Sequence, residues 1–298
     1  MKKLIKNILV HADLTENSLN AINTAIKMSR RHQAVLHLLY VLDIKNLYPA
    51  ERMLGPMAVY TGESFKRDTV ILEGMTKAIS QKHNIQCICY NEQGFLSSTI
   101  CDKAAKLNCD LIIMATGENE YGSNYLIDSL PYRVLQKSSC ALLTVPVKRR
   151  FDYFRNILFP VRVSSALDDK YLWTEAIARH NQSNIFIIGL LEQKEPAHFR
   201  KIRTSLANTR QWMNRARLPH RSDVRSESNL IQNILEAGRS DQSDLIVFNA
   251  STERSLKEFF LGSYTQKMIR NQEFAVLYLK SKDYLNRSKI MKLQPASS

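Results

Sequence analysis

Glycine, paired cysteine and long apolar runs are all scarce in this sequence, and each shortage excludes a class of function. Only 9 of the 298 residues are glycine and 8 are proline, so the composition argues against a disordered chain. The five cysteines and seven histidines show no C-x-x-C or H-E-x-x-H spacing, which argues against a metal centre. The longest apolar run, residues 185–191, is far shorter than a membrane span of about twenty residues. The sequence predicts a cytoplasmic protein with no metal and no membrane partner.

Positive charge exceeds negative charge, and the excess is concentrated in one segment. The formal net charge is +14, and residues 198–225 carry eight Lys or Arg against one acid, Asp223. Such a segment could suit nucleic acid. However, residues that favour burial recur through it at a spacing of three or four: Ile202, Leu206, Thr209, Met213 and Ala216. This spacing is typical of an amphipathic helix whose opposite face is charged because it faces water, so nucleic-acid binding ranks last among our hypotheses.

One sequence pattern occurs twice in the chain. The run Asp110-Leu-Ile-Ile-Met114 returns as Asp244-Leu-Ile-Val-Phe248, and a later apolar run that begins at residue 141 returns at residue 275. Ser129 and Ser263 lie between these runs, and every matched pair is 134 positions apart. A constant offset across three features indicates a duplication. Each copy has roughly 140 residues, the usual size of a domain with one hydrophobic core.

Each copy alternates short apolar strands with amphipathic helices. Strands are predicted at residues 7–11, 35–42, 86–90, 111–115 and 141–147, and again at 156–161, 185–191, 223–226, 245–249 and 275–280. Helices are predicted from about 13 to 31, at 64–82, 97–107 and 124–137, and at 168–180, 197–217, 229–238 and 256–270. This order predicts an α/β fold of two tandem open five-stranded parallel sheets, each with helices on both faces. We expect domains at residues 1–147 and 155–280, a linker at 148–154, and a basic tail at 281–298.

The expected sheets place one crevice in each copy. A ligand site in an open parallel sheet lies beyond the carboxyl ends of the strands, where the strand order reverses. In the first copy this brings Asp13 toward residues 116–129, and in the second it brings Arg162 toward residues 249–263. Asp13 has two open interpretations, as a cap on the first helix or as a ligand-binding residue.

The sequence resembles the universal stress protein family in its tandem, two-domain form, over about residues 3–147 and 153–280. The resemblance is carried by Asn7-Ile-Leu-Val-His-Ala-Asp13, by the strand of residues 34–43, by the run that begins at Asp110, and by Leu261-Gly-Ser263. It implies the Rossmann-like fold of that family. Because family members dimerise through their last strand, it also implies that the two copies pair within one chain as a pseudo-dimer about an internal pseudo-two-fold axis, and a homodimer is an open alternative.

The resemblance also identifies a nucleotide motif that both copies have lost in part. Nucleotide-binding members carry G-x2-G-x9-G-[ST] after the fourth strand and an Asp after the first. The first copy has Ala115, Glu118, Asp128 and Ser129 at the motif positions, and the second has Asn249, Thr252, Gly262 and Ser263. Arg162 replaces the acid in the second copy. The two copies have therefore lost different halves of the site, and the sequence favours Ser251 or Thr252 as a helix cap over a phosphate ligand.

The sequence thus gives a set of candidate ligand-binding residues but no catalytic group. The candidates are Asp13, Val41, Thr116, Ser129, Arg162, Asn249, Ser251, Thr252, Gly262 and Ser263. We expect a non-catalytic stress-response module with regulatory function that acts through protein partners of unknown identity and needs no cofactor. The second hypothesis is a sensor that binds ATP or ADP in its second domain, and the third is nucleic-acid binding through the basic surface.

Overall fold

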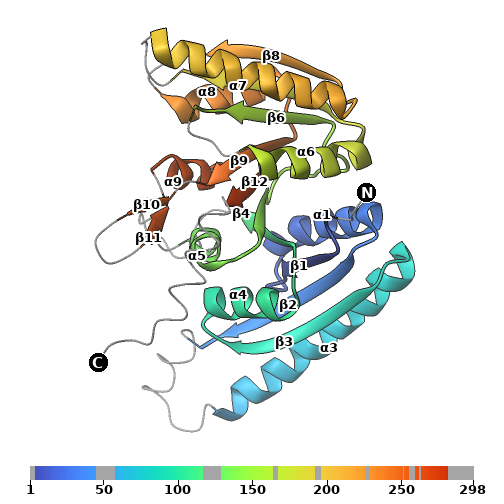
Figure 1. Ribbon diagram of the computed structural model, residues 1–298. Helices are drawn as coiled ribbons and strands as arrows, with labels where there is room; N and C mark the ends of the chain where they lie inside the picture. Colours follow the sequence, from blue (N-terminus) through green and yellow to red (C-terminus); the bar gives the residue numbers. More distant parts are fainter. Residues whose placement is uncertain are drawn as a thin grey trace. The chain divides into compact units, whose positions relative to one another are not determined.

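The computed structural model describes residues 4–44, 58–116, 129–163, 167–191, 196–225, 229–250, 252–254, 259–261 and 263–280. The chain forms two compact units, Met1–Asp152 and Tyr153–Ser298. In each unit a parallel sheet has helices on both of its faces (Figure 1). The predicted basic tail at 281–298 and the positions Glu118, Asp128, Ser251 and Gly262 lie outside the described residues.

The first unit contains five parallel strands in the order β3-β2-β1-β4-β5. The strands are β1 (Asn7–His11), β2 (Val35–Asp43), β3 (Cys87–Gly94), β4 (Leu111–Thr116) and β5 (Ala141–Pro146). The helices are α1 (Glu16–His32), α3 (Ala58–His83), α4 (Leu96–Lys106) and α5 (Leu130–Lys137). Helices α1 and α3 contact each other on one face, and α4 and α5 on the other. The strand order reverses between β1 and β4, as the sequence predicts.

The second unit repeats this topology in the order β8-β7-β6-β9-β12. Its parallel strands are β6 (Asn156–Val161), β7 (Asn184–Leu190), β8 (His220–Arg225), β9 (Leu245–Ala250) and β12 (Ala275–Lys280). Its helices are α6 (Asp168–Asn181), α7 (Pro196–Arg215), α8 (Leu230–Ser240) and α9 (Ser263–Ile269). A short antiparallel hairpin, β10 (Thr252–Arg254) with β11 (Phe259–Leu261), precedes α9. Both units therefore have the predicted α/β fold.

The duplication extends to individual hydrogen bonds. The carboxylate of Asp110 accepts the backbone N–H of Asn7 at 3.0 Å, and that of Asp244 accepts the N–H of Asn156 at 3.0 Å. Each asparagine also donates its side-chain amide to the carbonyl two residues before that aspartate, at 3.4 and 3.1 Å. These aspartates fix the amino end of the first strand to the loop before the fourth. Their role is structural, which explains why the run is the clearest repeat in the sequence.

Some sequence expectations differ from the structure, apart from shifted ends such as those of β8, which begins at His220 instead of residue 223, and of α3, which begins at Ala58 instead of residue 64. The predicted helix at 256–270 is replaced in its first half by β11, and the helix itself begins only at Ser263. The apolar pair Phe259 and Phe260 suits a strand better than an isolated helical turn, because aromatic residues favour extended backbone. In the first helix, the spacing predicts Leu19 on the buried face, but it is 47% exposed. The buried face of α1 instead follows Ala21, Ile22, Ala25 and Met28.

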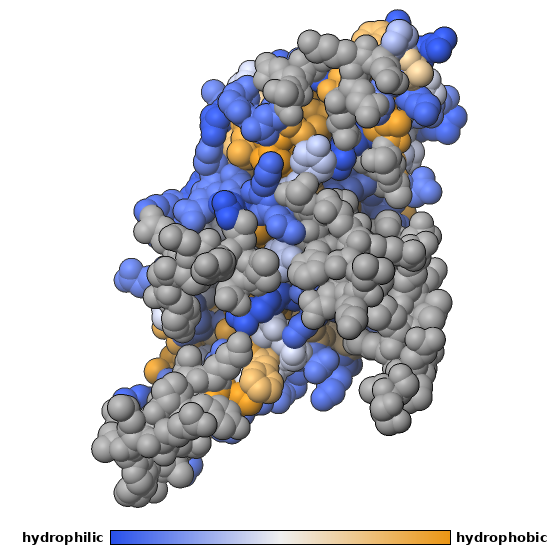
Figure 2. Space-filling model, turned by 90° about the vertical axis from the view of Figure 1, so that its left-hand side faces the viewer, coloured by the Kyte–Doolittle hydropathy of each residue, from blue (hydrophilic) through white to orange (hydrophobic). Residues whose placement is uncertain are grey.

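The basic segment of the second unit behaves as the amphipathic pattern predicts. Every member of the expected stripe on and after α7 is buried: Ile202, Leu206, Thr209, Met213 and Ala216. Most of the neighbouring arginines, Arg203 and Arg210 among them, are exposed. Hydrophilic residues also predominate among the coloured atoms of the face in Figure 2, where apolar residues form separate patches. The positive charge of α7 is thus the solvated side of a packed helix.

The segment of residues 146–152, which we name the strap, is fastened to α1 within the first unit. The side-chain amide of Asn20 donates to the carbonyls of Pro146 and Arg149, both at 2.5 Å. The ammonium of Lys27 pairs with the carboxylate of Asp152, also at 2.5 Å. These three contacts hold the strap against the surface of the helix.

Candidate functional site

At the carboxyl edge of the first sheet, Asp13 is bound to its own turn. One of its carboxylate oxygens accepts the backbone N–H of Thr15 at 2.9 Å and the hydroxyl of the same residue at 2.8 Å. Thr15 in turn caps α1 by accepting the N–H of Asn17 at 3.2 Å. The residue between them, Leu14, has a φ of 60°, a conformation that few side chains favour and that such a turn stabilises. Asp13 therefore positions the helix cap.

A histidine that the sequence reasoning did not single out lies beside this turn. His11 is the last residue of β1, and burial lowers its pKa to about 4, although the nearby carboxylate of Asp13 opposes the shift. Its imidazole is neutral near pH 7. The matching position in the second copy is Pro160, so no repeat of the residue signals it.

The remaining candidates of the first unit occupy different environments. Thr116 ends β4 and is 7% exposed, and its hydroxyl has no hydrogen-bond partner in the described part of the chain. Val41 is buried in β2, where it pairs with β3 and is separated from β4 by β1. Ser129 is the residue before α5, and its hydroxyl does not cap that helix. Thr116 and Asp13 thus follow neighbouring strands, whereas Val41 belongs to the next strand along.

At the carboxyl edge of the second sheet, Arg162 contacts the start of α9. Its guanidinium lies 4.7 Å from the ring centroid of Tyr264, the second residue of that helix. Asn249 is half-buried near the end of β9. Thr252 lies in β10 rather than before a helix, so it does not cap one, and Ser263 is the first residue of α9. The structure brings Arg162 and α9 together, as the strand order requires.

A buried lysine lies beneath Arg162, and no sequence signal pointed to it. Lys170, in the first turn of α6, is only 2% exposed. Its Nζ donates to the carbonyl of Pro160 at 2.5 Å and lies 4.3 Å from the ring centroid of Phe159. Burial, and secondly the positive charge of Arg162, lower its pKa to about 7. Within the described residues no carboxylate forms an ion pair with this ammonium, so its charged form is poorly stabilised.

The described residues show no feature of a metal centre or a membrane span. No group of three or more His, Cys, Asp or Glu among them could hold a metal ion. None of the described helices combines the length and the apolar character needed to cross a membrane.

Comparison with known proteins relates the first half of the chain to one family. The model of the universal stress protein family matches residues 4–146. Universal stress protein Sll1654 of Synechocystis sp. is 29% identical over 147 residues, which are 48% of this chain and 87% of the relative. The crystal structure of a universal stress protein from Archaeoglobus fulgidus has 16% identity and a TM-score of 0.72, and the match covers 94% of this chain and 99% of that one. That last likeness concerns the fold alone. Residues 4–146 therefore match the universal stress protein family, and the fold of the chain is similar to that of a universal stress protein.

Proposed function

We propose that this protein is a non-catalytic binding and regulatory module that acts through protein partners and does not use ATP as a resident ligand. One observation carries the proposal. Asp13, the acid that nucleotide-binding members place after the first strand, directs an oxygen at Thr15 in the first unit, and the second unit has Arg162 there instead, against Tyr264. At the position after the first strand, one unit therefore has an acid engaged by its own turn, and the other unit has an arginine.

The phosphate half of the motif supports the same proposal. In the sequence, Glu118 and Asp128 stand where nucleotide-binding members have glycines. Two unit charges about 4 Å apart interact by about 1 kcal/mol in water and by several times more where water is partly excluded. Two carboxylates near a triphosphate would therefore repel it, in addition to the space that their side chains occupy.

Calorimetric titration with ATP tests this proposal. We expect no saturable heat with the natural protein at micromolar nucleotide, and we expect binding to appear when the motif is rebuilt in the first unit by A115G, E118G and D128G together. The matched control is D102N, which neutralises an exposed acid of α4 outside the motif and leaves the motif incomplete. Saturable micromolar ATP binding by the natural protein would overturn the proposal.

A second candidate, a nucleotide sensor in the second unit, is favoured by Arg162, which follows β6 and whose guanidinium lies 4.7 Å from the ring centroid of Tyr264 in α9. An anionic group placed beside this guanidinium would meet positive charge. Millimolar ADP should then raise the melting temperature of the natural protein and not that of R162A. An equal response of both proteins, or no response, removes this candidate.

We also propose that the two units pair through β5 and β12. Each is the end strand of its own unit's sheet, and an end strand exposes N–H and C=O groups that can pair with another strand. Separately expressed halves should then be unstable or should associate when mixed. Two stable monomeric halves that ignore each other would contradict this pairing.

A further inference from the structure

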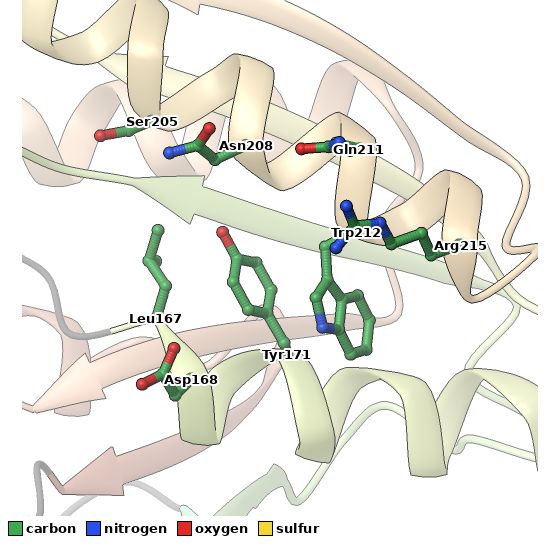
Figure 3. A pocket seen from close by; sticks show the side chains of 8 residues that line it. All are labelled: Leu167, Asp168, Tyr171, Ser205, Asn208, Gln211, Trp212 and Arg215. Carbon is green, nitrogen blue, oxygen red and sulfur yellow. The ribbon is translucent and has the colours of Figure 1, made fainter.

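The second unit contains a cavity between its two outer helices, away from the residues of the degraded nucleotide motif. The cavity has a volume of about 350 Å³ and opens between α6 and α7 (Figure 3). It is lined by Leu167, Asp168, Tyr171, Ser205, Asn208, Gln211, Trp212 and Arg215. Figure 3 shows the rings of Tyr171 and Trp212 in the space between the helices, with the polar side chains of α7 along one side. A cavity of this size suits a small ligand of one or two rings.

One wall of the cavity is a fixed aromatic surface. Tyr171 stacks on Trp212 with ring centroids 4.9 Å apart and planes 15° apart, and it also stacks on Phe159 with centroids 5.7 Å apart and planes 3° apart. The Thr209 hydroxyl donates its proton to the Ser205 carbonyl at 2.7 Å, so the Tyr171 hydroxyl must donate to Thr209 across their 2.9 Å contact. Burial raises the pKa of Tyr171, which keeps that donor protonated. The wall is therefore preorganised, so ligand binding would not carry the entropic cost of ordering these side chains.

The opposite side of the cavity offers hydrogen bonds that the protein does not use. Asn208 and Gln211, three positions apart on α7, present two carboxamides, each with donors and an acceptor. Neither amide has a hydrogen-bond partner in the described residues. Asp168 and Arg215 also line the cavity, and their opposite charges give no net preference for a charged ligand. The arrangement favours a neutral ring with both donors and acceptors on its edge.

The first unit shows that this cavity is not required by the fold. Helices α3 and α7 correspond at an offset of 133, because Thr76 and Thr209 both donate to the carbonyl four residues earlier at 2.7 Å. At this offset Ser205 and Trp212 correspond to Leu72 and Ile79, which are 1% and 9% exposed. Aliphatic side chains thus fill the first unit where the second has a hydroxyl and an indole.

The same substitution occurs on the other helix. Helices α1 and α6 correspond at an offset of 149, since Gln33 and Gln182 both end them with a positive φ, 51° and 52°. Tyr171 then corresponds to Ile22, which is 3% exposed. Aromatic and polar residues on both helices of the second unit therefore stand where the first unit has buried aliphatic residues, which gives the cavity a lining suited to recognition.

We propose that this cavity binds a small neutral planar heterocycle, which packs against the rings of Tyr171 and Trp212 while Asn208 and Gln211 hydrogen-bond its edge. Ligand binding here would give the module a chemical input, independent of whether the proposed absence of ATP binding holds. The aromatic wall and the two amides determine the chemical class of the ligand, and the cavity volume limits the size of the ligand.

Titrations of the full-length chain test the proposal with three probes, adenine, uracil and nicotinamide, and with cyclohexanecarboxamide as a non-planar control. The indole of Trp212 reports binding by fluorescence in a W173F background, since the chain has two tryptophans. Saturation-transfer NMR of the probes provides a second measurement that does not depend on fluorescence. At least one planar probe should saturate in both measurements, and cyclohexanecarboxamide should not.

Two paired variants then locate the site. N208A/Q211A should weaken the planar probe by about tenfold, the effect of removing two hydrogen bonds of ordinary strength. R210A/N214A changes exposed residues of α7 that do not line the cavity and should leave the affinity unchanged. The proposal is overturned if every planar probe fails to saturate below about 10 mM, or if N208A/Q211A and the natural protein bind the probe with equal affinity.

Discussion

Replacing the buried Lys170 by methionine should stabilise the second unit near neutral pH and lose that advantage in alkali. Burial lowers the lysine pKa from 10.5 to about 7, and each factor of ten in proton affinity is worth about 1.4 kcal/mol. The folded state therefore carries a penalty of up to about 5 kcal/mol while the unfolded chain is fully protonated. Methionine has a similar length and no charge, so K170M removes that penalty.

The pH dependence separates this effect from simple repacking. Between pH 7 and about pH 10 the unfolded chain holds a proton that the folded chain has released, so raising the pH stabilises the natural protein. The same rise in pH does not change the stability of K170M through residue 170, because methionine does not bind a proton. The difference in unfolding free energy between the two proteins should shrink by about 3 to 4 kcal/mol across that range. At the alkaline end of this range K170M should be the less stable protein, because the neutral amine still donates a hydrogen bond to the Pro160 carbonyl and methionine cannot.

Urea unfolding followed by tryptophan fluorescence measures this difference selectively. Both tryptophans, Trp173 and Trp212, belong to the second unit, so the signal reports the unit that contains Lys170. The natural protein and K170M are compared at several values from pH 6.5 to pH 10. A difference in unfolding free energy that stays constant over this range would refute the reasoning, because it would mean that Lys170 releases its proton at the same pH in the folded and unfolded states.

Other substitutions test the contacts that organise each unit. T209V should lower the unfolding free energy by about 1–3 kcal/mol, because it leaves the buried Tyr171 hydroxyl without an acceptor. T76V, at the matching position, should lower it by less, because it loses only a hydrogen bond within its own helix. Equal losses of unfolding free energy in urea would contradict this. D110A should lower the unfolding free energy by about 2–3 kcal/mol, because the carboxylate accepts hydrogen bonds from two backbone N–H groups, at 2.7 and 3.0 Å. An unchanged midpoint of urea unfolding would show that these bonds are not needed for stability. His11, whose pKa burial lowers to about 4, should show no NMR titration step above pH 5. Because the unfolded chain takes up that proton near pH 6.5, H11Q should reduce the loss of stability between pH 6.5 and pH 4, and a step near pH 6.5 in the folded protein would be inconsistent with burial.

The sequence was sufficient to predict the fold because the same information is present twice. The repeated run at Asp110 and Asp244 has a physical cause, since each carboxylate fixes the start of its unit's first strand. Alternating strands and helices then leave few topologies once parallel pairing and right-handed crossovers are required. The hairpin before α9 was missed because Phe259 and Phe260 suit either a strand or a buried helix face, and sequence spacing over so few residues does not separate the two.

The candidate sites were less predictable, because they depend on which side chains become buried. The sequence places Lys170 in an ordinary helix, and only the packed structure shows that its ammonium points inward to Pro160. Asp13 had two interpretations, and the structure gives direct evidence for the contact with Thr15. The cavity in the second unit is visible in the sequence only by comparing copies, where Tyr171 and Trp212 stand in place of Ile22 and Ile79. Such a comparison needs the helix offsets, which only the structure supplies.

The contacts of the strap also determine where a polypeptide of the first unit alone should end. A first-half polypeptide that stops at Val147 would leave Lys27 without Asp152 and would remove one of the two carbonyl acceptors of Asn20. A polypeptide that stops at Asp152 retains both. Any attempt to express the ancestral single-copy protein should therefore end after Asp152, because the residues that join the copies have become part of the first one's surface.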